Sequence, residues 1–216
     1  GSVPGARGDD AKFRFSFDPI AAWSATMFWH YNPAGAPAQF SDPAAVAAAM
    51  QQAIGKWAAA CSVPAAYAGM TGVPPESTVG DAENGSMPDQ VNVVGWKATP
   101  SGISGYTVAF PGYAESGVTP IVDADVVIDP AKLPGIDQLT RLLVHEFGHA
   151  IGLGHEHQNP AGGIQWNEAV VIRNLSGPPN NWDEATIRHN VIAKYSADQI
   201  RGTQFDPKSI MLYFFP

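Results

Sequence analysis

The order of apolar patterns along this 216-residue chain predicts an α+β fold. A short apolar strand precedes an amphipathic helix pattern, three strand-like runs follow, and a second helix pattern ends at Gly152. Beyond Gly152 the patterns are shorter and are separated by segments rich in Pro and Asn. We therefore expect a regular part up to this glycine and a less regular part after it.

The first strand and the first long helix are marked by composition and by start signals. Residues 24–31, SATMFWHY, are apolar and aromatic and are followed by the turn sequence NPAG. Ser41 or Asp42 is the expected helix cap, and Pro43 suits the first turn. The apolar residues that then recur at helical spacing are Val46, Met50, Ile54 and Trp57.

Strands and shorter helices fill the rest of the pattern. The expected strands are QVNVVGW (90–96), GYTVAF (105–110) and DADVVID (123–129). The last run alternates, with Val126 and Ile128 on one face and Asp125 and Asp129 on the other. A loop is expected at 71–90, a second long helix from about Asp137 to Gly152, and short helices at 167–175 and 183–195.

Composition and charge exclude several classes of function. A formal net charge of −8 and a pI near 5.0 do not favour binding to nucleic acid or to anionic membranes. The sequence contains no apolar run of the ~20 residues that a membrane-spanning helix needs. The single cysteine, Cys61, excludes a disulfide within the chain, and we interpret it as a small buried apolar residue rather than a reactive thiol.

The stretch LLVHEFGHAIGLGHEHQNP (142–160) holds four of the six histidines. His145 and His149 are four residues apart, so a helix presents both imidazoles on one face, where both could bind the same zinc ion. Glu146 is placed to act as general base toward a water whose pKa the metal lowers. A surface helix that carries these residues by coincidence is the alternative interpretation of the five-residue motif alone.

The residues that follow extend this motif. Gly152 suits the left-handed conformation that ends a helix, and Gly154 gives the chain further freedom to turn. His155 could then return as a third ligand, which leaves the fourth zinc position open for water, as in catalytic sites. The full pattern HExxHxxGxxH is the metzincin signature.

A second segment, KSIMLYFFP (208–216), resembles the Met-turn of metzincins, with Met211 as the methionine that lies beneath the zinc-binding histidines in that clan. The chain is most similar to the astacins, which carry a glutamate after the third histidine, here Glu156, and a tyrosine two residues after the methionine, here Tyr213. Astacins usually contain disulfides, and their mature N-terminus is buried against that glutamate. This chain has one cysteine and cannot form an internal disulfide, so it departs from the family in this respect.

The resemblance implies a metzincin-like catalytic domain with a twisted mixed sheet of about five strands, two long helices above the cleft and a small irregular lower subdomain. It implies one catalytic Zn²⁺ ion held by three histidines, with Tyr213 as an extra ligand that swings away and donates to the oxyanion. We interpret residues 1–10 as a tag remnant and extension, and 11–216 as one domain with subdomains of about 11–152 and 153–216.

The expected activity is zinc-dependent hydrolysis of internal peptide bonds in proteins, with Glu146 passing the proton to the leaving amine. The resemblance implies an extended substrate along an edge strand, which points to 105–110, although that run also suits an interior strand. We expect a secreted monomer, with a possible pro-segment. A narrow processing protease or toxin and a non-catalytic zinc-binding domain are the alternatives.

The remaining candidates have simpler interpretations. His157 is too close to His155 to bind the same ion easily, so we expect a residue that supports the ligands or lies at the surface. His30 and His189 are isolated, and we assign them no function. The cluster GDAENGSMPD (80–89) has enough oxygen atoms to bind calcium, but it lacks a recognised loop spacing, and a solvated acidic loop is the favoured interpretation.

Overall fold

In a computed structural model, the chain forms two compact units. The first unit covers the described residues up to Gly152, except 102–103, and the second covers 102–103 and everything described from Leu153 on. The described ranges are 26–61, 64–72, 92–99, 102–113, 120–196 and 204–213. For 61, 109–113 and 120–123 the structure describes the backbone alone.

The first unit is built on a mixed sheet with strand order β2-β1-β3-β5-β4. The strands are β1 (Met27–Tyr31), β2 (Ala65–Met70), β3 (Asn92–Trp96), β4 (Gly105–Tyr113) and β5 (Pro120–Ile128). The pairs β1–β2, β1–β3 and β3–β5 are parallel, whereas β4 runs antiparallel to β5 at one edge. The predicted sheet of about five strands is confirmed.

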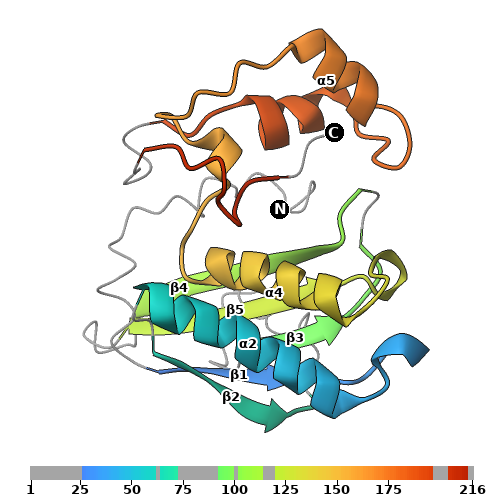
Figure 1. Cartoon of the computed structure of the whole chain (residues 1–216), viewed down its shortest axis with the longest axis vertical. Coiled ribbons are helices and arrows are strands. Elements are labelled where there is room, and N and C mark those ends of the chain that lie inside the picture. Colours follow the sequence, from blue (N-terminus) through green and yellow to red (C-terminus); the bar gives the residue numbers. More distant parts are fainter. Residues whose placement is uncertain are drawn as a thin grey trace. The chain divides into compact units, whose positions relative to one another are not determined.

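Two long helices, α2 (Pro43–Cys61) and α4 (Ile136–Ala150), contact each other and pack against the sheet (Figure 1). The carboxylate of Asp42 accepts a hydrogen bond from the Ala44 N–H at 2.9 Å, so the predicted cap is in place. The predicted apolar face of α2 is confirmed, because Val46, Met50 and Ile54 are buried. The short helices in this unit are η1 (Ala38–Phe40) and η2 (Pro130–Lys132).

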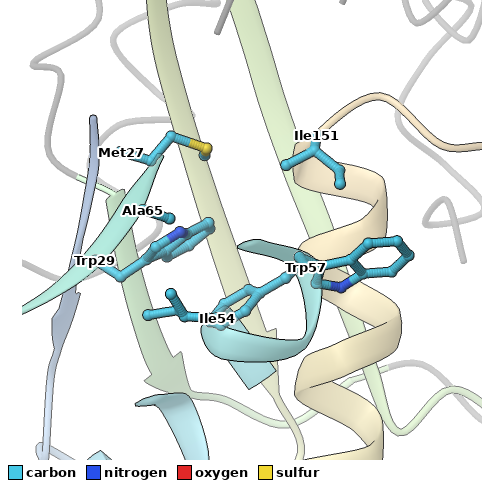
Figure 2. Close-up of a pocket in the computed structure, with 7 residues that line it drawn as sticks. Met27, Trp29, Ile54, Trp57, Ala65 and Ile151 are labelled. Carbon is cyan, nitrogen blue, oxygen red and sulfur yellow. The ribbon is translucent and has the colours of Figure 1, made fainter. Parts of the chain in front are cut away.

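Aromatic side chains from β1 and α2 contact α4. Trp29 on β1 stacks on Phe147 of α4 with ring centroids 4.3 Å apart. The indole N–H of Trp57 on α2 donates to the carbonyl oxygen of Val144 at 2.7 Å. Figure 2 shows Trp29, Trp57 and Ile151 around a small apolar pocket at this end of the core. These contacts fix both the position of α4 and its rotation about its own axis.

Two features of the sheet differ from the sequence pattern. Strand β2 was missed, because AAYAGM contains no β-branched residue and Gly69 has a φ of +104° next to a register shift in β1. In β5 the face that carries Asp125 is also covered. Asp125 is 1% exposed, and its carboxylate accepts the Val93 N–H at 3.0 Å. The alternation therefore marks two buried faces rather than one buried face and one in solvent.

The second unit is made of short elements joined by irregular chain. They are η3 (Glu156–Gln158), α5 (Glu168–Leu175), α6 (Glu184–Ile187) and the π-helical turn η4 (Arg188–Ile192). Asn167 and Asp183 cap α5 and α6 by accepting the N–H groups of Val170 and Thr186. No helix in the described parts of the chain is long and apolar enough to cross a membrane.

Three sequence-based interpretations lie outside the described residues. They concern the possible calcium loop at 80–89, the extension at 1–10 and the side chain of Cys61.

Candidate metal centre

One face of α4 packs in the core and another carries the first two candidate ligands. Leu139, Leu143 and Phe147 are buried, whereas His145 and His149 are half-buried one helical turn apart. Their Nε2 atoms are 3.1 Å apart, and their rings are nearly perpendicular, with an interplanar angle of 88°. Both nitrogens therefore face a common point, as the four-residue spacing predicts.

The end of α4 directs the chain toward the third histidine. Gly152 has a φ of +97°, and its N–H donates to the carbonyl oxygen of His149 at 2.9 Å. This confirms the left-handed glycine predicted at the end of the helix, where an L side chain would be strained. Leu153 and Gly154 then lead to His155, only three residues beyond the turn.

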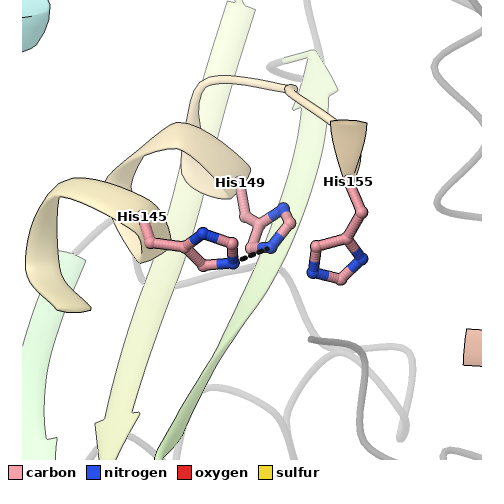
Figure 3. A group of neighbouring side chains, drawn as sticks. All are labelled: His145, His149 and His155. Atoms are coloured by element: carbon pink, nitrogen blue, oxygen red, sulfur yellow. Dashed lines mark hydrogen bonds between the residues drawn. The ribbon is translucent and has the colours of Figure 1, made fainter. Parts of the chain in front are cut away.

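His145, His149 and His155 form a group in which one ring nitrogen of each lies within 4.8 Å of the others (Figure 3). Two nitrogens that bind one zinc ion tetrahedrally at ~2.0–2.1 Å lie about 3.3 Å apart, close to the separation of the two Nε2 atoms. Imidazole nitrogen is also a preferred zinc donor. The residues present therefore fit a zinc ion.

Glu146, the predicted general base, is only 1% exposed. The hydroxyl of Thr107 on β4 lies 2.7 Å from its Oε2 and 2.9 Å from its carbonyl oxygen. Sequence reasoning missed Thr107, and no local pattern points to it, since it stands 39 residues before Glu146. The buried carboxylate is thus held by a polar group from the edge strand.

In the second unit, aromatic rings surround His155. The ring of Tyr213 lies 4.3 Å from that of His155 and 4.6 Å from that of His157, measured between centroids. His157 is 1% exposed, and its Nε2 lies 2.8 Å from the carbonyl oxygen of Asn190. His157 is therefore buried, and the surface alternative is wrong. His189, in contrast, is exposed.

The predicted Met-turn segment is tied to the third histidine by the main chain. Met211 is 3% exposed and lies in a turn closed by a bond from the Leu212 N–H to the Ser209 carbonyl oxygen. The carbonyl of Met211 accepts the N–H of Glu156 at 3.0 Å. The residue after His155 is thereby joined to the turn.

The side chain of Glu156 strengthens the same connection. Its Oε1 accepts the side-chain N–H of Asn159 and the backbone N–H of Asp206, both at 3.1 Å. The family resemblance implies an amino terminus as the partner of this carboxylate. In this chain, two donors from within the unit occupy one of its oxygens.

Tyr195 packs against the segment just before the third histidine. A Cβ added at Gly154 would lie 2.8 Å from Cε2 of Tyr195, so a side chain at that position would collide with the ring. Burial raises the pKa of Tyr195, and a hydrogen bond to the backbone of His155 partly offsets this. The ring therefore explains why glycine stands at position 154.

Comparison with known proteins adds evidence about the fold. No protein-family model and no curated protein sequence matches this chain. A solved structure of myroilysin is similar over 88% of this chain and 77% of its own, with 20% identity and a TM-score of 0.54. A second, a crystal structure of myroilysin, is 21% identical over 87% of this chain and 69% of its own, with a TM-score of 0.41. The first match confirms the α+β architecture predicted from the sequence.

Proposed function

We propose that this chain is a zinc-dependent endopeptidase of the metzincin type, with astacin-like features, that hydrolyses internal peptide bonds of proteins. The observation that carries the proposal is the group of His145, His149 and His155. Glu146 follows the first of these histidines on the same helix and is buried. Three neutral imidazoles leave one zinc position open, which suits catalysis better than a structural role.

Each site residue has a separate role in the proposal. His145, His149 and His155 hold the ion, and zinc bound there would supply a Lewis acid and lower the pKa of water. Glu146 accepts the proton of the attacking water and returns it to the leaving amine, so one carboxylate serves both steps. The need for a single, well-held carboxylate agrees with the burial of Glu146.

Tyr213 is proposed as an additional zinc ligand and as the donor to the oxyanion. Its ring already lies against that of His155, with centroids 4.3 Å apart. A phenol placed beside a ligand could exchange between metal and substrate by rotating its side chain.

The proposed substrate is an extended polypeptide bound along β4. This strand lies at the edge of the sheet and pairs with β5 on one side. An edge strand presents main-chain N–H and C=O groups that can pair with an added strand. Monomeric action outside the cell, and release from a pro-segment, belong to the same proposal and are supported by the family resemblance alone.

Two alternatives give different outcomes in one assay. A narrow processing protease or toxin would carry the same zinc site but cut one target, whereas a non-catalytic zinc-binding domain would cut none. The buried glutamate favours an enzyme, because a binding domain has no use for a general base.

The test is cleavage of unfolded casein by the wild type and by Glu146→Ala, with the cut sites identified by mass spectrometry. We expect cleavage by the zinc-loaded wild type only, and its loss after treatment with a zinc chelator. Zinc content of the variant serves as the control for an intact site. A zinc-loaded wild type that cuts nothing would exclude the broad endopeptidase.

A further inference from the structure

We propose that Thr107 is a positioning residue that holds the carboxylate of Glu146 in the orientation needed for proton transfer. This inference rests on the proposed function, since it assigns a partner to the proposed general base. Both residues lie in the first unit, so their contact is described within one compact body.

The Thr107 hydroxyl makes a short contact with the carboxylate of Glu146. The Thr107 hydroxyl lies 2.7 Å from Oε2 of Glu146, and the carbonyl oxygen of the same residue is 2.9 Å away. The hydroxyl has one proton, and a bond to a charged oxygen is the stronger of the two choices. Within the described part of the chain, no other hydrogen bond to this carboxylate is found.

The packing of β4 against α4 creates this contact. A Cβ at Gly105 would lie 2.9 Å from the carbonyl oxygen of Val127 on β5 and 3.0 Å from Cδ2 of Leu142 on α4, so glycine fits where the strand is close to both neighbours. Two residues along a strand advance about 6.7 Å, and four residues along a helix about 6 Å. The step from Gly105 to Thr107 therefore matches the step from Leu142 to Glu146.

The consequence for the reaction concerns the two carboxylate oxygens. With Oε2 engaged by Thr107, Oε1 is the oxygen left to accept the proton of the attacking water. The hydroxyl also removes rotamer freedom from a side chain that must receive and then return this proton. Because Thr107 lies on the proposed substrate strand, one short segment positions both the substrate backbone and the base.

The kinetic test compares Thr107→Val, which keeps the shape and removes the hydroxyl, with Thr107→Ser, which keeps the hydroxyl. We expect Thr107→Val to lower kcat about 10–100-fold, with KM nearly unchanged and zinc affinity within about twofold of wild type. Thr107→Ser should recover most of the lost kcat. An unchanged kcat in Thr107→Val would overturn the proposal.

Thr140→Val is the matched control. The Thr140 hydroxyl on α4 donates to the carbonyl oxygen of Ile136 at 3.0 Å, so the same substitution removes a helical hydroxyl that does not touch Glu146. We expect kcat to stay at the wild-type value in this variant. An equal loss in Thr140→Val and Thr107→Val would show a general effect of packing and overturn the positioning role.

A second measurement does not depend on activity. In the metal-free protein, urea unfolding of wild type, Thr107→Val, Glu146→Ala and the double variant forms a double-mutant cycle. We expect the midpoint shift caused by Thr107→Val to be at least twofold smaller when Glu146 is absent. Additive shifts would show that Thr107 and Glu146 are not coupled, and would overturn the positioning role whether or not the protein cuts casein. A coupled cycle in a protein without peptidase activity would instead contradict the proposed function.

Discussion

His145 and His149 lie on a long helix that packs in a hydrophobic core, whereas His155 lies on an irregular segment held by individual hydrogen bonds. In the first region, the position of the ligands follows from the packing of Leu143 and Phe147 and from one indole hydrogen bond to Val144. The packing of α4 thereby sets where its two histidines stand.

The second region uses individual hydrogen bonds instead. The N–H of Glu156 bonds to Met211, its carboxylate binds the N–H of Asp206, and the side chain of Gln158 donates to the carbonyl oxygens of His189 and Ala193. Each bond contributes about 0.5–1.5 kcal/mol, and none is part of a repeating pattern. Placement of the third ligand therefore depends on a few contacts, and a point mutation can remove those that side chains make.

Substitution of the proposed zinc ligands should have the largest effects on zinc affinity. The cost to the stability of the metal-free protein should differ between the two regions. Both His149→Ala and His155→Ala should lower zinc affinity by more than the 10–100-fold that loss of a supporting partner costs. The metal-free protein should be destabilised more by His155→Ala, because His155 is buried against Tyr213, whereas His149 is half-buried. Chelator competition and urea unfolding measure the two quantities. Equal destabilisation by both variants would contradict the contrast.

The next largest effect is expected at Glu156. Glu156→Ala removes the acceptor for Asn159 and Asp206 and should lower zinc affinity about tenfold. Glu156→Gln keeps an acceptor oxygen and should stay close to wild type. If Glu156→Gln is as damaging as Glu156→Ala, the charge is what matters, as in the pairing with an amino terminus that the family resemblance implies.

Gly154→Ala tests the packing of Tyr195. The new Cβ would collide with the ring, so we expect a loss of about 1–3 kcal/mol in the free energy of unfolding, measured with urea. Gly163→Ala is the matched control, because a Cβ there meets nothing within 4 Å, and it should change stability by no more than about 0.5 kcal/mol. Similar losses of stability in Gly154→Ala and Gly163→Ala would contradict the prediction that the collision with Tyr195 is the cause.

The smallest effect is expected in the core region. Trp57→Phe removes the indole donor to Val144 and should cost about 1 kcal/mol in unfolding free energy. Zinc affinity should not change, because the remaining apolar contacts still orient α4. A clear fall in zinc affinity would show that the helix is less well fixed by its core than the packing implies.

The same contrast explains what the sequence could predict. Helical periodicity and the spacing of the histidines predict α4 and its ligand face, because these depend on residues a few positions apart. The Ala-rich strand β2 has no such pattern. The contacts of Thr107 with Glu146 and of Glu156 with Asp206 join positions 39 and 50 residues apart, so they become evident only in the folded chain.

The proposed function requires that His145, His149 and His155 bind one zinc ion together. X-ray absorption spectroscopy of the protein loaded with one equivalent of zinc tests it directly, with His155→Ala measured alongside. We expect three imidazole nitrogens at ~2.0–2.1 Å in the wild type and two in the variant. A wild-type spectrum with two imidazoles that does not change in His155→Ala would contradict it.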